Sequence, residues 1–258
     1  MRAVDHQYFD APFIAMAHRG GALLATNIGR ENTLQAFRNA ADLGFRYLET
    51  DVHVTRDGAL VAFHDDSLDR GSDRTGRIAD LPLCEVRQAR VGGEPIPTLD
   101  EVFASVDCRI NIDLKASGAA APLAHAIRRH GAEDRVCVGS FNEARLHRFR
   151  RLAGPKVATA VGRVGVGAAI AATRCRVGPA PRGAAFQVPI RTTIAGRQVE
   201  VVTPAFIRRA HAWGKDVHVW TIDDEQTMHE LIDWGVDGLV SDRIDVLKQV
   251  CQARGLWW

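Results

Sequence analysis

Short apolar runs alternate with segments of helical period along the whole chain. The apolar runs have the length of buried strands and lie at 13–17, 47–54, 109–115, 135–141, 156–161, 184–188, 216–222 and 238–242. Helical periodicity covers the segments between them, at 33–43, 99–105, 120–129, 142–152, 165–174, 204–212, 224–234 and 243–253. Eight strand–helix units in succession predict an α/β fold, a (β/α)8 TIM barrel. A doubly wound open sheet is the alternative, because the number of units does not by itself close a barrel.

Two segments interrupt this alternation. Residues 55–98 contain an extra strand and a charged loop, so a small insertion over about 65–98 is expected after the second strand. Residues 189–203 have the pattern of a hairpin that turns at Ala195–Gly196. Neither segment has the length of a separate domain, and we expect a single barrel domain over residues 1–258.

Composition and charge argue against several classes of protein. The 33 Lys and Arg against 31 Asp and Glu leave a net charge of +2, which does not favour binding to nucleic acid or an anionic membrane. No run approaches the roughly 18 apolar residues of a membrane span, and Asp5 and Asp10 interrupt any signal-peptide pattern. Scattered cysteines without a C-x-x-C pair are expected to be reduced core thiols: Cys84, Cys108, Cys137, Cys175 and Cys251. These features predict a cytoplasmic protein without a transmembrane segment.

Acidic residues stand on two of the predicted strands near their carboxyl ends, where a parallel barrel carries its active site. Side chains two apart on a strand share a face, so Glu49 and Asp51 point the same way, as do Asp113 and Lys115. If that direction is inward, three carboxylates meet at one mouth, and such oxygen ligands suit Mg²⁺ or Ca²⁺ rather than zinc. A structural ion pair with arginine is the alternative way to compensate buried acids.

Polar motifs follow one another in a specific order from residue 14 to about residue 247. In chain order they are His18-Arg19-Gly20, Glu31-Asn32-Thr33, Glu49-Thr50-Asp51, Asp57-Gly58, His64-Asp65, PTLDEVF at 97–103, Asn111-Ile112-Asp113-Leu114-Lys115, Val219-Trp220-Thr221 and Ser241-Asp242. In this order the motifs resemble the glycerophosphodiester phosphodiesterase family. The resemblance implies a (β/α)8 barrel, one divalent metal ion, and cleavage of glycerophosphodiesters to sn-glycerol 3-phosphate and an alcohol.

The resemblance also implies roles for individual residues. It assigns catalysis to His18, as the base, and to His64, as the acid. It assigns metal binding to Glu49, Asp51 and Asp113, and substrate binding to Arg19, Lys115 and Trp220. The family usually has a glutamate at the position of Asp113, whose side chain is one methylene shorter. The base would activate either the glycerol 2-hydroxyl or a water.

Two other activities stay open. A lysophospholipase D or sphingomyelinase D-like activity on single-chain lipids is the alternative enzyme, and an apolar groove beside His18 and His64 would favour it. A barrel that binds phosphate compounds without turnover is the alternative from a different class. The loop at 21–30 and the insertion at 65–97 are expected to lie over the mouth and to restrict it to small head groups.

The remaining histidines and the chain end have less specific patterns. His53 shares a face with Asp51 and lies one step further out, and His218 is expected in the core. Surface positions are expected for His6, His125, His130, His147, His211 and His229. The apolar ending Leu256-Trp257-Trp258 is expected to pack on the barrel, with a homodimer or membrane contact as the alternative.

Overall fold

The computed structural model describes residues 2–175, 178–194 and 196–257 of the chain. Within them, eight parallel strands follow the order β8-β7-β6-β2-β1-β13-β12-β9, and β3 pairs antiparallel with β2. The parallel strands are β1 (Ile14–Ala17), β2 (Tyr47–Val54), β6 (Arg109–Leu114), β7 (Val136–Gly139), β8 (Ala158–Thr159), β9 (Ala185–Val188), β12 (Asp216–Val219) and β13 (Gly238–Ser241). Each lies inside a segment that the apolar pattern predicts, so the prediction of eight strand units is confirmed.

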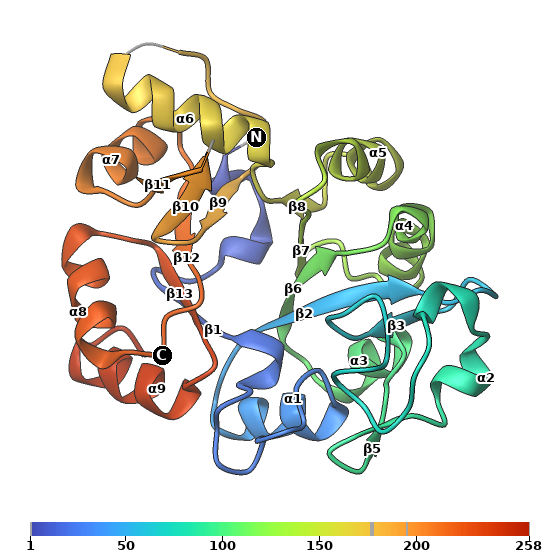
Figure 1. Cartoon of the computed structure of the whole chain (residues 1–258). Coiled ribbons are helices and arrows are strands. Elements are labelled where there is room, and N and C mark those ends of the chain that lie inside the picture. The colour runs from blue at the N-terminus through green and yellow to red at the C-terminus, as the bar shows by residue number, and fades with distance from the viewer. Residues whose placement is uncertain (1, 176–177, 195, 258) are drawn as a thin grey trace.

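The two edge strands of this order meet and close the sheet. The backbone N–H of Val161 donates to Ala185 O at 2.7 Å, and that of Ala184 donates to Thr159 O at 2.7 Å. These bonds join the chain after β8 to β9, where Ala160 and Ala185 form a parallel bridge. The open-sheet alternative is therefore wrong, and the fold is a (β/α)8 barrel (Figure 1).

Helices follow the strands and surround the barrel (Figure 1). They are α1 (Leu34–Asp42), α3 (Leu99–Ser105), α4 (Ala120–Arg129), α5 (Glu143–Ala153), α6 (Arg163–Cys175), α7 (Pro204–Ala212), α8 (Glu225–Trp234) and α9 (Ile244–Ala253). Side chains cap several amino ends: Thr33 accepts the N–H of Ala36, and Thr203 accepts that of Phe206. Such caps satisfy amides that lack a partner inside the helix, and these helices therefore begin where the sequence signals predict.

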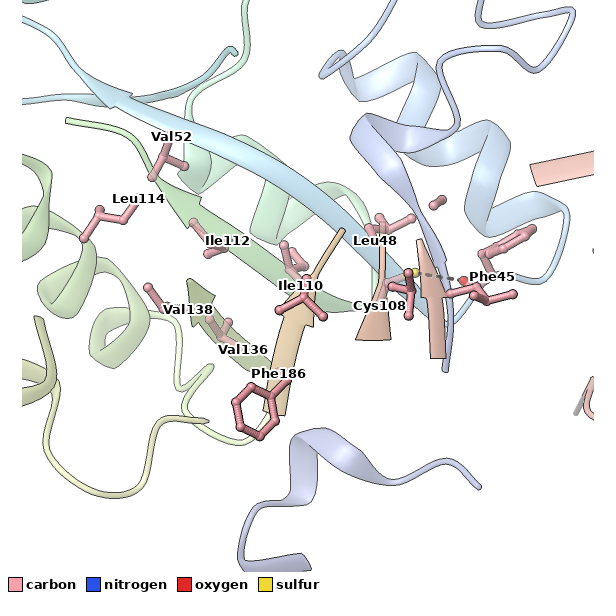
Figure 2. Packing of buried hydrophobic residues seen from close by; sticks show 14 of the residues in the cluster. Phe45, Leu48, Val52, Cys108, Ile110, Ile112, Leu114, Val136, Val138 and Phe186 are labelled. Atoms are coloured by element: carbon pink, nitrogen blue, oxygen red, sulfur yellow. Dashed lines mark hydrogen bonds between the residues drawn. The ribbon is translucent and has the colours of Figure 1, made fainter. Parts of the chain in front are cut away.

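Along each strand, side chains point alternately toward the surrounding helices and into the barrel. Figure 2 shows Leu48 of β2, Ile110 of β6 and Val136 of β7 within the apolar cluster that packs the sheet against the helices. The strand period of two turns the residues between them to the opposite face. Glu49 and Asp113 therefore point into the barrel, as the pattern predicted.

The amino-terminal segment packs at the end of the barrel where the strands begin. It forms two short 3-10 turns, η1 (Ala3–Asp5) and η2 (Gln7–Phe9). Tyr8 is fully buried, and its ring stands edge-on to that of Tyr47 with the centroids 5.4 Å apart. The Tyr47 hydroxyl donates to Tyr8 O at 2.8 Å. This segment therefore covers the amino ends of the strands.

Burial differs from prediction at one histidine near this segment. His6 is buried and its Nδ1 lies 3.0 Å from Lys156 O, so its predicted surface position is wrong. The reason is the docking of the amino-terminal segment, which the local pattern did not reveal. His218 is fully buried, as predicted.

The insertion after β2 has a small apolar core of its own. Its elements are β3 (Leu60–Ala62), η4 (Ile78–Asp80), α2 (Leu83–Val86), β4 (Arg90–Val91) and β5 (Glu94–Pro95). The buried side chains that gather against β3 are Val61, Phe63, Leu68, Ile78, Val86, Ala89, Val91 and Ile96. The extra strand and the insertion are thus confirmed.

The predicted hairpin is also present. Strand β10 (Arg191–Ile194) pairs antiparallel with β11 (Arg197–Glu200). Of the predicted turn, Gly196 has a φ of +75°, a conformation that glycine adopts without strain. Ala195 lies outside the described residues.

The sequence predicted the burial of most cysteines correctly, but not that of Cys84. Cys108, Cys137 and Cys251 are buried free thiols, whereas Cys84 is exposed, so the core prediction is wrong for Cys84. Cys84 lies on the four-residue helix α2, which buries only Val86. The side chain of Cys175 lies outside the described residues.

Trp257 packs on the barrel, as predicted. Its ring stands edge-on to that of Phe45 with the centroids 4.9 Å apart, and Lys248 Nζ lies 5.4 Å from the Trp257 ring. Trp258 lies outside the described residues. In the described ranges of the chain, none of the helices combines the length and apolar character that crossing a bilayer requires. The cytoplasmic location and the homodimer stay predictions.

Candidate active site

The carboxyl ends of the strands surround one cavity of about 730 Å³. Its lining includes every residue to which the sequence assigned catalysis, metal binding or substrate binding: His18, Arg19, Glu49, Asp51, His64, Asp113, Lys115 and Trp220. Since parallel strands end at a common rim, residues far apart in the sequence meet here. The structure thus brings the predicted residues together, while their roles stay predictions.

Two adjacent strands present the acidic residues. Asp51 of β2 and Asp113 of β6 are register partners, so their side chains neighbour each other inside the barrel. Lys115 Nζ contacts both, 3.0 Å from Asp51 Oδ1 and 2.7 Å from Asp113 Oδ2. Glu49 lies one step deeper on β2 and accepts the backbone N–H of Arg19 at 3.2 Å. Below, the acid cluster means Glu49, Asp51 and Asp113.

Burial shifts the protonation equilibria of the acid cluster. Burial and the charge of Asp51 raise the pKa of Glu49 to about 8. Burial also disfavours ionised Asp51, but the charges of Lys115 and Arg19 outweigh it and hold the pKa of Asp51 below its ordinary value. Burial raises the pKa of Asp113 although Lys115 opposes the shift. The pKa values of the acid cluster are therefore shifted in opposite directions, down for Asp51 and up for Glu49 and Asp113.

The acid cluster has the donor chemistry of a site for a hard divalent cation. Its carboxylate oxygens are the ligands that Mg²⁺ and Ca²⁺ prefer, and they line one cavity, in which Glu49 and Asp51 are buried. In the part of the chain that the structure describes, no three acidic, histidine or cysteine side chains are arranged to hold a metal ion as they stand. Lys115 contacts two of the acids directly. The residues fit such an ion by type, charge and burial.

The Glu31-Asn32-Thr33 motif orients Arg19 and Asp51. Arg19 Nη1 donates to Glu31 Oε1 at 3.2 Å, and Arg19 Nε lies 3.3 Å from Asp51 Oδ2. Asn32 donates to Asp51 Oδ2 at 3.1 Å and accepts the hydroxyl of Thr50 at 2.7 Å. Arg19 and Asn32 both have left-handed backbones, with φ of +50° and +59°. Such conformations cost energy and recur at functional sites. Sequence reasoning recognised this motif but missed its contacts.

Asp242, which follows β13, orients His18. His18 Nδ1 lies 2.9 Å from Asp242 Oδ1, and its Nε2 lies 3.7 Å from Glu49 Oε2. Burial disfavours the charged imidazole, but Glu49 and Asp242 outweigh it and raise the pKa of His18. Asp223 holds Asp242 in turn, because its Oδ1 accepts the backbone N–H of Asp242 at 2.8 Å. The sequence placed Asp242 at a strand end without a partner, and it contained no signal for Asp223.

Asp65, the next residue in the chain, orients His64. His64 Nδ1 lies 2.5 Å from Asp65 Oδ1. Arg70 donates two hydrogen bonds to Asp65, at 2.6 and 2.8 Å, and holds the pKa of Asp65 well below its usual range. The buried His53 has its Nε2 3.1 Å from His64 O. His53 therefore supports the backbone of His64.

The outer wall of the cavity comes from segments other than those predicted. Its members beyond the charged residues include Phe141, Val161, Val164, Val166, Gly167, Ile170, Val188, Pro189, Thr192, Thr193 and Val201. Of the described lining residues, none belongs to the loop at 21–30 or the insertion at 65–97, so these segments do not line the cavity, and the restriction to small head groups stays a prediction. The loop instead folds against the rim, where the Leu23 N–H donates to Asp242 O at 3.0 Å.

Comparisons with known proteins match most of the chain. A family model described as the glycerophosphoryl diester phosphodiesterase family matches residues 18–246. A Mycobacterium tuberculosis protein named "Probable glycerophosphodiester phosphodiesterase 2" is 41% identical over 258 residues, which cover 95% of this chain and 92% of the relative. A solved glycerophosphodiester phosphodiesterase from Parabacteroides distasonis has a TM-score of 0.76 at 22% identity, over 95% of this chain and 99% of that one. An Oleispira antarctica phosphodiesterase, solved with the product sn-glycerol-3-phosphate, has a TM-score of 0.78 at 24% identity over 95% and 99%.

Proposed function

Since the chain belongs to the glycerophosphoryl diester phosphodiesterase family, we propose that it hydrolyses glycerophosphodiesters to sn-glycerol 3-phosphate and an alcohol through His18 and His64. One observation carries this mechanism: both histidines line one cavity, and each has an aspartate oxygen beside its Nδ1. The product bound to the Oleispira antarctica phosphodiesterase supports the same product class for this chain.

Because an aspartate lies beside Nδ1, Nε2 is the nitrogen of each histidine that accepts or donates the proton in the reaction. Nδ1–H donates to the carboxylate, so the neutral ring carries its lone pair on Nε2. The side chain of His64 is 31% exposed and that of His18 is 15% exposed. We assign His64 as the acid because the alcohol it protonates must depart toward solvent, and His18 as the base, as the family resemblance implies.

The reaction then needs two proton transfers. His18 Nε2 accepts the proton of the attacking hydroxyl, either the glycerol 2-hydroxyl or a water, as its oxygen bonds to phosphorus. The bond from phosphorus to the alcohol oxygen breaks, and protonated His64 donates its proton to that oxygen. Attack by the glycerol hydroxyl forms a cyclic phosphate, which a water opens in a second step with the histidine roles reversed.

The charges around the cavity suit a phosphodiester anion. Arg19 presents a planar fork that can hold two phosphate oxygens, and Lys115 supplies a point charge. We propose that the acid cluster holds one divalent cation, Mg²⁺ or Ca²⁺. When bound, such a cation stabilises the charge that develops on the phosphate oxygens. Trp220 would provide an apolar wall for the substrate.

A panel of glycerophosphocholine, glycerophosphoethanolamine and glycerophosphoglycerol, each assayed with Mg²⁺, Ca²⁺ or EDTA, tests the proposal. We expect stoichiometric release of sn-glycerol 3-phosphate and the alcohol, with metal and not with EDTA. Saturable binding of these compounds without turnover under every condition would instead support the non-catalytic barrel.

A further inference from the structure

Two side-chain amides from strands that are not neighbours meet inside the cavity. Gln187 of β9 donates from its Nε2 to Asn111 Oδ1 of β6 at 2.7 Å, and both residues line the cavity. Around the closed sheet, β7 and β8 stand between these two strands. The hydrogen bond therefore crosses the interior of the barrel instead of following its wall. Below, the amide pair means Asn111 and Gln187.

The amide pair lies at the floor of the cavity. Cys137, the register partner of Asn111 on β7, belongs to the buried apolar cluster around Tyr8. Two residues further along β7, Gly139 lines the cavity, and a Cβ added there would lie 3.3 Å from Gln187 Oε1. The missing side chain at Gly139 thus leaves the space that Gln187 crosses. The cavity ends in this polar layer, next to the apolar cluster.

Both members of the amide pair keep hydrogen-bonding capacity toward the cavity. Their mutual bond uses the donor of Gln187 and the acceptor of Asn111, which leaves Gln187 Oε1 as an acceptor and Asn111 Nδ2 as a donor. With both amides turned round, one acceptor and one donor would still remain. A neutral hydroxyl donates and accepts at once, whereas a phosphate oxyanion only accepts and an ammonium group only donates. The amide pair is therefore complementary to a hydroxyl group.

The amide pair also lies beside the acid cluster. Asn111 is the register partner of Glu49 and precedes Asp113 by two positions on β6, so these three side chains share the inward face. A substrate whose phosphate lies at the acid cluster brings its nearest hydroxyl groups to the amide pair. The proposed acid, His64, is the more exposed histidine and releases the alcohol toward solvent. The glycerol half of the substrate then stays at the floor of the cavity.

We infer that the amide pair binds the terminal hydroxyl of the glycerol moiety and that Gln187 is a specificity-determining residue; this rests on the proposed function. Of the two glycerol hydroxyls, the one next to the phosphate-bearing carbon can serve as the attacking group at His18. The terminal hydroxyl is then free to donate to Gln187 Oε1 and to accept from Asn111 Nδ2. A substrate without it leaves the buried Asn111 amide without this partner, which disfavours its binding.

A pair of substrates on the unmodified protein tests the inference. The value of kcat/KM is measured for glycerophosphocholine and for the 1-phosphocholine of propane-1,2-diol, an analogue that lacks only the terminal hydroxyl, with choline release as the readout. We expect a preference for glycerophosphocholine of roughly 10- to 100-fold, the effect of leaving a buried polar group unpaired. Equal values, or a preference for the analogue, overturn the inference and leave the proposed function standing. No choline release from either compound overturns both.

A substitution at Gln187 assigns this preference to the amide pair. Gln187→Met keeps a side chain of similar length but replaces the amide by a thioether, which donates no hydrogen bond. The ratio of the two kcat/KM values should fall to less than about threefold, through slower hydrolysis of glycerophosphocholine. Hydrolysis of the analogue should change little, and it reports that the variant folds.

Two further variants complete the test. Gln187→Asn keeps an amide that is one methylene too short for the bond to Asn111, and it should lower the ratio in the same way. Gln226→Met, at an exposed position on α8, is the matched control and should keep the ratio of the unmodified protein. Equal ratios in the Gln187 variants and the control would overturn the assignment to Gln187.

Discussion

Asp242 Oδ1 lies 2.9 Å from His18 Nδ1, although 224 positions separate the two residues in the chain. They follow adjacent strands, because β13 pairs in parallel with β1 and places Ser241 opposite Ala17. The last strand of the barrel therefore orients a side chain that follows the first. The other histidine of the site, His64, receives its carboxylate from the residue next to it.

The two histidines are expected to account for most of the turnover. His18→Ala and His64→Ala should each lower kcat by roughly 10²–10⁴, the usual contribution of a positioned acid or base. Steady-state kinetics with glycerophosphocholine provides the measurement, and circular dichroism checks the fold. His147→Ala, an exposed position on α5, is the control. Turnover close to that of the unmodified protein in either active-site variant would remove that residue from the mechanism.

Asp242 is expected to act as a positioning residue through His18. Asp242→Asn removes the charge beside Nδ1, and kcat should fall by roughly 10- to 100-fold, the value of a hydrogen bond to a charged group. KM should change little, because Asp242 positions the base rather than the substrate. Asp245→Asn is the matched control, since Asp245 pairs with Arg243. Equal loss in both variants, or a change confined to KM, would contradict the positioning role.

The acid cluster is expected to bind one divalent cation. EDTA should abolish activity, and Mg²⁺ or Ca²⁺ should restore it. Titration calorimetry should show one site per chain in the unmodified protein and none in Asp113→Asn, whereas Asp113→Glu, with the longer side chain, should retain binding. The exposed Asp107→Asn is the control. Full activity after exhaustive chelation would rule out the metal.

Asn32 is expected to contribute to stability through both its backbone and its side chain. In Asn32→Ala, alanine must adopt the left-handed backbone at φ +59° without the side-chain amide of asparagine. The substitution also removes the hydrogen bond to Asp51. Unfolding in urea should show a loss of about 2–4 kcal/mol, from the left-handed backbone and the unpaired buried group. Asn32→Gly should recover about 1 kcal/mol of this loss, because glycine tolerates the conformation. Equal losses would show that only the side chain matters.

The two buried tyrosines at the amino end of the barrel are expected to respond differently to loss of the hydroxyl. Among the described residues, the Tyr8 hydroxyl has no hydrogen-bond partner, whereas that of Tyr47 donates to Tyr8 O at 2.8 Å. Tyr8→Phe should leave the free energy of unfolding unchanged or raise it, since it removes an unpaired buried polar group. Tyr47→Phe should lower it by about 1–3 kcal/mol. A larger loss for Tyr8→Phe would contradict this difference.

The local sequence pattern was sufficient to predict the strands and which of their side chains share a face. In β2, Leu48 and Val52 alternate with Glu49 and Asp51, and a strand must place these two sets on opposite faces whatever surrounds it. The common face of Glu49 and Asp51 could therefore be predicted from the eight residues of β2, and that this face is the inward one was decided by the packing of Leu48 and Val52 against the helices. The aspartate beside His64 was equally accessible, because it is the next residue in the chain.

The path of loops could not be predicted in this way. The loop at 21–30 was expected over the mouth because it leaves a strand end that carries site residues, and nothing in the sequence indicated that α6 would line the cavity. The loop is held against the rim by the bond from Leu23 N–H to Asp242 O, whereas α6 turns Val166 and Ile170 to the cavity. Helical spacing indicates that such residues share a face, and it does not identify what that face contacts.

The sequence by itself determined the eight strand–helix units, the common face of Glu49 and Asp51 and the set of polar motifs, because these depend on periods of two and 3.6 residues and on short local spacings. Only the tertiary structure decided that the barrel closes between β8 and β9, that Asp242 orients His18, and that one face of α6 lines the cavity. These contacts join residues that no local period relates. They form because parallel pairing places the carboxyl ends of β1 and β13 side by side, and because the packing of α6 turns one of its faces to the cavity.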